Sequence, residues 1–330
     1  MKKIYIVFLA VIALTLTAIP AAASDMPPGL CEYMARLAVG RLYVPYYKVT
    51  ASNEEKEDRV VMYKPEVEET EEESSADVPP VGMIAVQAVN LSRYELTDTP
   101  PMLLVNETKY TADLYESAEK TPKGAVLILH THGTEAYLPD GAKHYSEDED
   151  FRSYTEAETV VAVGTVFAET LRAAGIEVFH DTTMYDAKSF DNAYAASRAG
   201  AKAWLEKHPQ ISYVIDLHRD AVAREGVGCK TLCSGTTEPT AQVMLVIGTN
   251  EAGAAHPYWR QNLAIAATYQ EQLNAYPTLA RPVYLRRASF NQQLSAGAML
   301  LEVGSAANTI TEAKNAAVLA ADAFVKLYKG

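Results

Sequence analysis

Short apolar runs that end in charged or imidazole side chains constrain the fold of this chain more than any other feature. Three of them span 125–129, 213–217 and 298–301. Fully apolar runs of this length are typical of strands buried on both faces of a parallel sheet. We expect the second run to belong to a strand over 211–217, further strands over 176–180, 241–248 and 282–286, and helices over 156–174, 192–207, 258–273 and 311–328. This alternation predicts βαβ units, and therefore an α/β fold with a mostly parallel sheet flanked by helices.

Histidine and glutamate side chains, which commonly bind metal ions, follow all three runs. The first run leads into His130, His132 and Glu135, the second into His218, and the third into Glu302. Because ligands of open α/β sheets bind outside the carboxyl ends of the strands, we expect these side chains to converge in one crevice. Imidazoles together with carboxylates form the donor set of a hydrolytic zinc. The pattern therefore predicts a Zn2+ site.

Several other classes of function are disfavoured. The chain lacks a G-x-S-x-G nucleophile motif, a glycine-rich phosphate loop after its first strand and an H-E-x-x-H helix. Its 29 Lys and Arg residues against 42 Asp and Glu residues give a net charge of −13. Nucleic acid binding needs a basic surface, so we expect no nucleic acid partner.

The first 80 residues predict export and a tether. Residues 1–24 hold two lysines, an apolar stretch and an Ala-rich site, which is the pattern of a signal peptide or a membrane anchor. Residues 25–80 form an N-terminal segment and an acidic linker that ends in Pro79-Pro80. Residues 81–330 are then a single catalytic domain. We expect an extracytoplasmic protein, with the apolar segment either cleaved or kept as an anchor.

Cysteine is rare in this chain. Cys229 and Cys233 lie close together, whereas Cys31 is isolated. Their spacing is not that of a zinc pair, so we expect either a loop disulfide or two free thiols.

Over roughly residues 85–330, the chain resembles the stage II sporulation protein P family. The matching segments are LILHTHGTEAYLP at 127–139, VIDLHRDA at 214–221, QVMLVIGT at 242–249, RPVYLRRASFNQQLS at 281–295 and GAMLLEVGSAANT at 297–309. The family usually has Thr-Ser-Glu after the paired histidines, where this chain has Gly133-Thr134-Glu135. It keeps the later family pattern as Gly304, Ser305 and Asn308.

The resemblance implies a fold similar to the zinc N-acetylmuramoyl-L-alanine amidases. His132 and His218 then match the two histidine ligands, and Glu302 matches the catalytic glutamate. The third ligand stays open between Glu135 and His130, with Glu156 as an alternative.

The implied activity is hydrolysis of peptidoglycan. One cut releases the stem peptide from muramic acid, and an endopeptidase cut opens peptide cross-links. The family acts in endospore engulfment at the sporulation septum, with stage II sporulation proteins D and M as partners. Two other functions compete with this one: a non-catalytic septal scaffold that binds peptidoglycan, and an extracytoplasmic metallopeptidase that acts on proteins.

This interpretation assigns roles to further side chains. Glu302 is expected to act as general base. Arg219 either stabilises an oxyanion or binds a peptide carboxylate, or else it forms an ion pair with Asp216 or Asp220. The side chains expected to bind substrate are Asn291, Gln292 and Asn308.

Overall fold

The computed structural model describes residues 83–89, 91, 104–110, 114, 122–146, 151–224 and 227–330. The predicted signal or anchor at 1–24 and the linker at 25–80 lie outside these residues. Among the described helices, none combines the length and the apolar character needed to cross a membrane.

A seven-stranded sheet organises the described part of the chain, in the order β2-β10-β9-β11-β6-β3-β5. Neighbouring strands are parallel except at β9 and β11, which are antiparallel. The strands are β2 (Leu104–Asn106), β3 (Ala125–Leu129), β5 (Val178–His180), β6 (Ile211–Asp220), β9 (Val243–Gly248), β10 (Val283–Arg286) and β11 (Ala298–Ser305). The sheet is therefore mostly parallel, as predicted, but it reverses direction once.

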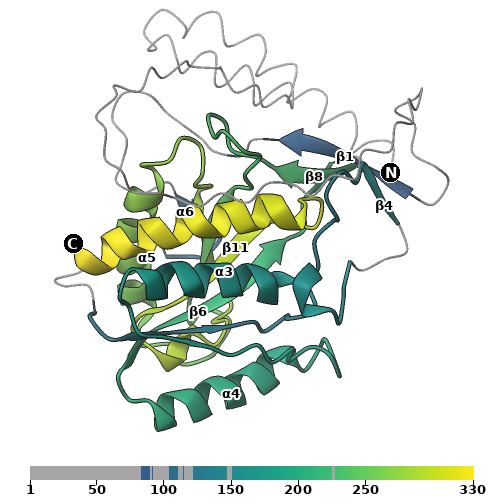
Figure 1. Ribbon diagram of the computed structural model, residues 1–330. Coiled ribbons are helices and arrows are strands. Elements are labelled where there is room, and N and C mark those ends of the chain that lie inside the picture. Colours follow the sequence, from purple (N-terminus) through teal and green to yellow (C-terminus); the bar gives the residue numbers. More distant parts are fainter. Residues whose placement is uncertain are drawn as a thin grey trace, which may run out of the picture. The chain divides into compact units, whose positions relative to one another are not determined.

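Helices cover the two faces of this sheet unequally. The helices are α3 (Val160–Ala173), α4 (Ala193–Lys207), α5 (Trp259–Leu273) and α6 (Ile310–Lys329). Figure 1 shows α3 and α6 side by side across the sheet, with α4 on its other side. The alternation of β3 explains this arrangement: Val126 and Ile128 join the core under α3, α5 and α6, whereas Leu127 and Leu129 pack toward Ala201 of α4.

The helix ends follow the chemistry of their sequences. Thr159 caps α3 by accepting a hydrogen bond from the Val161 N–H at 3.2 Å. That helix ends before Gly175, whose φ of 85° is the left-handed conformation that glycine tolerates best. Thr309 and Glu312 form a capping box at the start of α6. The predicted helix over 156–174 begins later than expected, because 156–158 form a short 3-10 helix, η1.

A second, four-stranded sheet was not predicted from the sequence. Its order is β4-β1-β8-β7, from β1 (Met83–Val89), β4 (His144–Ser146), β7 (Ala223–Arg224) and β8 (Val227–Thr231). Cys229 lies buried in β8, and both Cys229 and Cys233 are free thiols. Of the two alternatives left open for this pair, the structure has the free thiols.

Candidate functional site

A cleft of about 420 Å³ opens on the same face of the sheet as α4, over strands that α4 does not cover. Its floor is the small apolar cluster of Met244, Val246 and Leu300, which point to the same face as Glu302. The polar residues that line it are Glu107, His132, Glu135, His218, Asp220, Arg286, Arg287 and Glu302. Four predicted site residues, His132, Glu135, His218 and Glu302, thus meet in one cleft.

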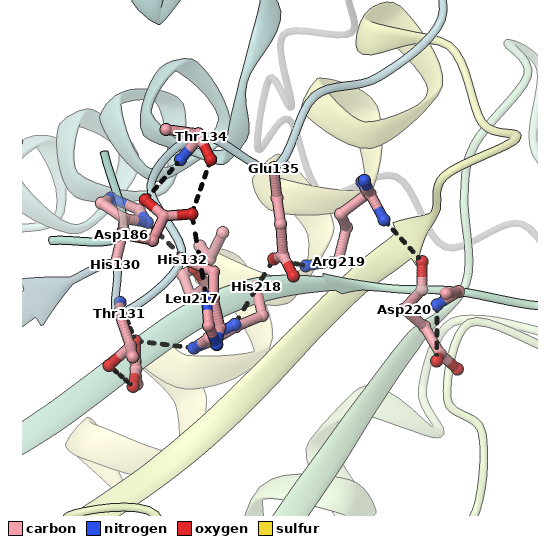
Figure 2. Close-up of polar contacts among 12 residues, drawn as sticks. His130, Thr131, His132, Thr134, Glu135, Asp186, Leu217, His218, Arg219 and Asp220 are labelled. Atoms are coloured by element: carbon pink, nitrogen blue, oxygen red, sulfur yellow. Dashed lines mark hydrogen bonds and ion pairs between the residues drawn. The ribbon is translucent and has the colours of Figure 1, made fainter. Parts of the chain in front are cut away.

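His132 and Glu135 come from the turn that follows β3. Asp186 fixes this turn by accepting hydrogen bonds from the backbone N–H of Thr134 at 3.1 Å and from its hydroxyl at 2.6 Å (Figure 2). Arg152 in turn donates to Asp186 at 2.7 Å. The Nδ1 atom of His132 lies 3.7 Å from the same carboxylate. The Asp186 and Arg152 contacts therefore orient the turn and the histidine that it carries.

His218 lies in β6 between two carboxylates. Its Nδ1 is 3.4 Å from Oε2 of Glu135, and its Nε2 is 2.9 Å from Oδ1 of Asp216. The Glu135 carboxylate also accepts the Arg219 backbone N–H at 3.1 Å, so it is held over β6 (Figure 2). Although burial opposes the charged form, the two carboxylates raise the pKa of His218 above its usual value. Burial likewise opposes ionisation of Glu135, but His218 holds the pKa of that carboxyl below its usual value.

Glu302 stands beside His218, because β11 pairs with β6 in a register that sets the two residues opposite each other. Its Oε2 atom is buried and has no hydrogen-bond partner among the described residues. Burial, together with the charges of Asp220 and Glu135, raises the pKa of Glu302 to about 8. A carboxyl with a pKa near neutrality can both accept and return a proton under physiological conditions.

Two aromatic side chains that sequence reasoning missed form one wall of the cleft. The Phe190 ring stacks on His132 with centroids 4.4 Å apart, and the Tyr194 ring meets His132 edge-on at 5.5 Å. The Arg152 guanidinium covers the Phe190 ring at 4.4 Å. Phe190 is nevertheless 53% exposed, which is unusual for a large apolar side chain. An aromatic residue in the polar segment 186–192 was the one signal in the sequence that pointed to it.

His130 does not enter the cleft. It continues the alternation of Val126 and Ile128 and so points to the α3 face of the sheet. Its Nδ1 lies 2.9 Å from the Leu217 carbonyl oxygen, and its Nε2 lies 2.9 Å from Nε2 of His180. Gly164 of α3 makes room for this pair, since a Cβ there would lie 2.5 Å from Cε1 of His130. His130 is therefore a buried core histidine in this structure, and Glu135 is the group beside His218.

Arg219 also points away from the cleft, on the opposite face of β6 from His218. Its Nε donates to the Ala136 carbonyl at 2.7 Å, and its terminal nitrogens donate to the carbonyls of Phe151 at 2.7 Å and Asp220 at 3.4 Å. The side chain thus fastens the segment after the β3 turn to β6. Neither the oxyanion role nor the ion pair expected from sequence is seen in these contacts.

The three amides expected to bind substrate are used inside the protein. Asn291 donates to the Tyr194 carbonyl at 2.7 Å and accepts from Nε of Arg198 at 2.8 Å. Gln292 accepts from the Gly248 N–H at 2.9 Å and donates to the Val246 carbonyl at 2.9 Å. Asn308 is fully buried and bonds to both backbone groups of Thr231. None of the three lines the cleft.

Glu156, the alternative ligand, lies exposed in η1 and is likewise absent from the cleft lining. Sequence spacing placed it at a helix start, but the chain turns through η1 before α3 begins. Glu135 is the acidic group that reaches His218.

The cleft offers the donors of a metal site without forming a complete one. Among the described residues, no three His, Cys, Asp or Glu side chains are arranged to hold a metal ion. Nδ1 of His132 and Nε2 of His218 face the carboxylates of Asp186 and Asp216, which leaves the other nitrogen of each ring for a metal ion. Two imidazoles, each with a carboxylate behind it, together with the Glu135 carboxylate beside His218, fit the donor chemistry of zinc.

Comparisons with known proteins agree with the sequence motifs. The chain is similar to stage II sporulation protein P of Bacillus subtilis (strain 168), with 28% identity over 259 residues. The aligned region covers 70% of this chain. The chain spans 62% of the length of that relative.

The fold of this chain is also similar to solved structures of amidases. The N-acetylmuramyl-L-alanine amidase Ami1 from Mycobacterium smegmatis has 12% identity and a TM-score of 0.36, covering 64% of this chain and 98% of that one. The CwlD amidase from Clostridioides difficile, solved in complex with the GerS lipoprotein, has 11% identity and a TM-score of 0.40, covering 62% and 98%. The sequence model of the stage II sporulation protein P (SpoIIP) family matches residues 37–325, and the chain therefore belongs to that family.

Proposed function

We propose that this protein is a zinc-dependent peptidoglycan hydrolase that cleaves the amide between N-acetylmuramic acid and L-alanine. One observation carries the proposal: His132, Glu135, His218 and Glu302 come from three separate strand ends and line a single cleft. A protein that only binds its ligand has no need for a buried carboxyl group beside two histidines of this kind. Membership of the family supports peptidoglycan as the substrate and sporulation as the setting.

His132, His218 and Glu135 would hold the zinc ion. When bound there, zinc would supply a Lewis acid that polarises a carbonyl and lowers the pKa of water. Asp216 and Asp186 lie behind the two histidines, where a carboxylate fixes the orientation of a ligating imidazole. The Phe190 ring covers one side of His132 and limits the access of bulk water to it.

Glu302 would carry the proton. Its carboxylate accepts a proton from the attacking water and returns it to the nitrogen of the leaving amine as the C–N bond breaks. The products are a free carboxylate on the muramic acid and a free amino group on the stem peptide. Oε2 of Glu302 is buried and has no hydrogen-bond partner among the described residues, so it is free to take up and return this proton.

The same resemblance supports a second, endopeptidase cut in stem-peptide cross-links. We place the protein outside the cytoplasmic membrane, exported by its N-terminal segment and anchored or released at the sporulation septum. Stage II sporulation proteins D and M are the proposed partners during engulfment. These points rest on the family resemblance and on the composition of residues 1–24.

Mass spectrometry of muropeptides tests the proposal directly. Purified full-length protein is incubated with peptidoglycan in the presence of zinc and, in parallel, with a chelator. We expect free stem peptides that begin with L-alanine, together with sugar strands that have lost them, only when zinc is present. Intact muropeptides in both samples would reject the amidase proposal.

A second candidate function is a peptidoglycan-binding scaffold without catalysis. The lack of a ready-made three-ligand arrangement among the described residues favours this alternative. It predicts that the protein sediments with intact peptidoglycan and leaves its composition unchanged. The mass spectra described above therefore separate the two functions.

A further inference from the structure

One end of the cleft carries the carboxyl group of Glu302, and the other, the arginine end, carries the guanidinium groups of Arg286 and Arg287. Glu302 pairs with Met244 across the antiparallel β9/β11 junction, whereas Arg286 pairs with Gly248 at the other end of β9. Met244 and Gly248 are four residues apart in one strand. At about 3.3 Å per residue, the arginine end therefore lies about 13 Å along the sheet from the level of Glu302.

Apolar side chains connect these two ends. Val246 and Leu300 are buried between them, and Tyr284 and Phe290 pack against this cluster. The cleft lies over this stretch of the sheet, where Met244, Val246 and Leu300 line it. A ligand lying here would place an apolar or backbone stretch on the floor and its polar groups at the two ends.

Two guanidinium groups, those of Arg286 and Arg287, line the arginine end of the cleft. Arg286 alternates with the core residues Val283 and Leu285, so it faces the cleft, where it pairs with Glu107. Both members of that pair are about 40% exposed, so the pair is weak and open to exchange with another carboxylate.

Arg287, in contrast, is anchored at one point only. Glu251 accepts from its Nε at 3.0 Å, and Glu251 is itself held by the Lys109 N–H at 2.8 Å. The two terminal nitrogens of Arg287 have no partner among the described residues, although the side chain lines the cleft and is 68% exposed. A guanidinium fixed through Nε with free terminal nitrogens is prepared for bidentate binding of a carboxylate.

The loop that carries these groups is held in a strained conformation. Phe290 and Asn291 have φ values of 49° and 58°, which is unfavourable for a phenylalanine. Gly248 permits the close approach of this loop, since a Cβ there would lie 2.3 Å from the Ala288 carbonyl oxygen. The Ala288 carbonyl accepts the Thr249 N–H at 3.1 Å, and the Arg287 carbonyl accepts the Ala252 N–H at 3.0 Å. The position of Arg287 is thus set by the fold.

We propose that Arg287, with Arg286 beside it, selects a substrate by binding a carboxylate three or four residues away from the scissile bond. An extended peptide covers about 3.3–3.6 Å per residue, so the 13 Å between the two ends accommodates three or four residues. The substrate class is therefore an acyl-linked tri- or tetrapeptide whose far end bears a carboxylate. The inference rests on the proposed function for the identity of the scissile bond.

Binding of synthetic peptides tests this inference without requiring cleavage. The probes are N-acetylmuramoyl peptides of two, three or four residues, each as the C-terminal acid and the C-terminal amide, with isoglutamine and lysine as the second and third residues. No other carboxylate then varies between probes. Affinities are measured by calorimetry with zinc present, in full-length protein carrying Glu302→Gln, in which the peptide is bound but not cut.

We expect the acid to bind about tenfold more tightly than the amide for three and four residues, with a ratio near one for two residues. Adding Arg287→Gln should bring the ratio for the longer peptides close to one. The matched control is Arg260→Gln, which removes the same charge from α5 outside the cleft lining and should keep the tenfold ratio.

Three outcomes would overturn the inference: an acid-to-amide ratio that Arg287→Gln leaves unchanged, a ratio equal at all three lengths, or no binding of any probe at millimolar concentration. Failure of the proposed function looks different. In that case the unmodified protein does not release peptide from N-acetylmuramic acid, while the calorimetric ratios still respond to Arg287.

Discussion

Asp216 joins the two segments that carry the histidines of the cleft, through its contacts with Thr131. It accepts the Thr131 N–H at 2.8 Å and the Thr131 hydroxyl at 2.6 Å. Its Oδ1 also lies 2.9 Å from Nε2 of His218. One buried carboxylate thus sets the position of the turn before His132 and the ring orientation of His218.

Replacing Asp216 should loosen both histidines. We expect Asp216→Asn to lower zinc affinity by about 10–100-fold, the usual loss when a carboxylate behind a metal-binding histidine is removed. Calorimetric zinc titration measures this effect. The control is Asp322→Asn on α6, whose carboxylate bonds to Tyr276 and Lys326 away from the cleft. Asp322→Asn should lower stability and leave zinc affinity unchanged. Equal zinc affinities in the unmodified protein and in both variants would contradict the role of Asp216.

His130 and His132 should behave differently although they are two residues apart. His130→Gln removes a buried imidazole from its contacts with Leu217 and His180, so we expect a loss of stability of about 1–3 kcal/mol. Zinc affinity should stay close to that of the unmodified protein. His132→Gln should instead lose zinc affinity with a smaller change in melting temperature. A loss of zinc in His130→Gln without unfolding would make His130 a ligand after all.

Glu302→Gln tests the proposed proton carrier. The amide keeps the size of the side chain but cannot accept a proton, so we expect amidase activity to fall by about 10²–10⁴-fold. Zinc affinity and melting temperature should change little, because the proposed ligands are retained. Release of muramic-acid-linked peptides at the unmodified rate would remove Glu302 from the mechanism, and loss of zinc would make it a ligand.

His256 should make the protein sensitive to mild acid. It is 2% exposed, and neither ring nitrogen has a hydrogen-bond partner among the described residues. Burial lowers the pKa of His256 from 6.5 to about 4. Between these two pH values the unfolded chain binds a proton that the folded protein does not. The stabilising contribution is therefore complete above pH 6.5 and is lost as the pH falls toward 4.

The measurement is the free energy of unfolding by denaturant at pH 7 and at pH 4.5. His256→Leu should lose less stability between these values than the unmodified protein does. Part of the acid sensitivity should remain, since burial also lowers the pKa of His130 to about 4. Parallel losses in the two proteins would show that His256 does not titrate in this range.

Sequence patterns predicted the helices and the main strands well, because their apolar periodicity is local. The reversal between β9 and β11 could not be predicted, since a fully buried strand has the same pattern in either direction. The second sheet was missed for a related reason: its strands are short, and partners such as Val86 and Gly228 lie far apart in the chain.

The sequence pointed to the residues of the candidate site that lie within a strand or directly after one. It missed the residues that lie in more distant loops. His218 and Glu302 stand inside strands, so alternation and register bring them together. The face of His130 also follows from alternation, but His132 lies in the turn beyond β3, where that rule ends. Phe190, Asp186 and Arg287 are placed by tertiary contacts that no local motif encodes. Asn291 and Gln292 have substrate-binding chemistry, but the fold uses it to hold its own backbone.

The single reversal at the β9/β11 junction has a consequence for engineering and for divergence within the family. Carboxyl ends of strands face both ends of the cleft, those of β6 and β11 at one end and those of β9 and β10 at the other. The loops at the two ends belong to different parts of the chain, so one can be exchanged while the other is retained. Exchanging residues 287 and 288 for those of another family member should therefore change the Arg287 end of the cleft while His132, Glu135, His218 and Glu302 keep their positions.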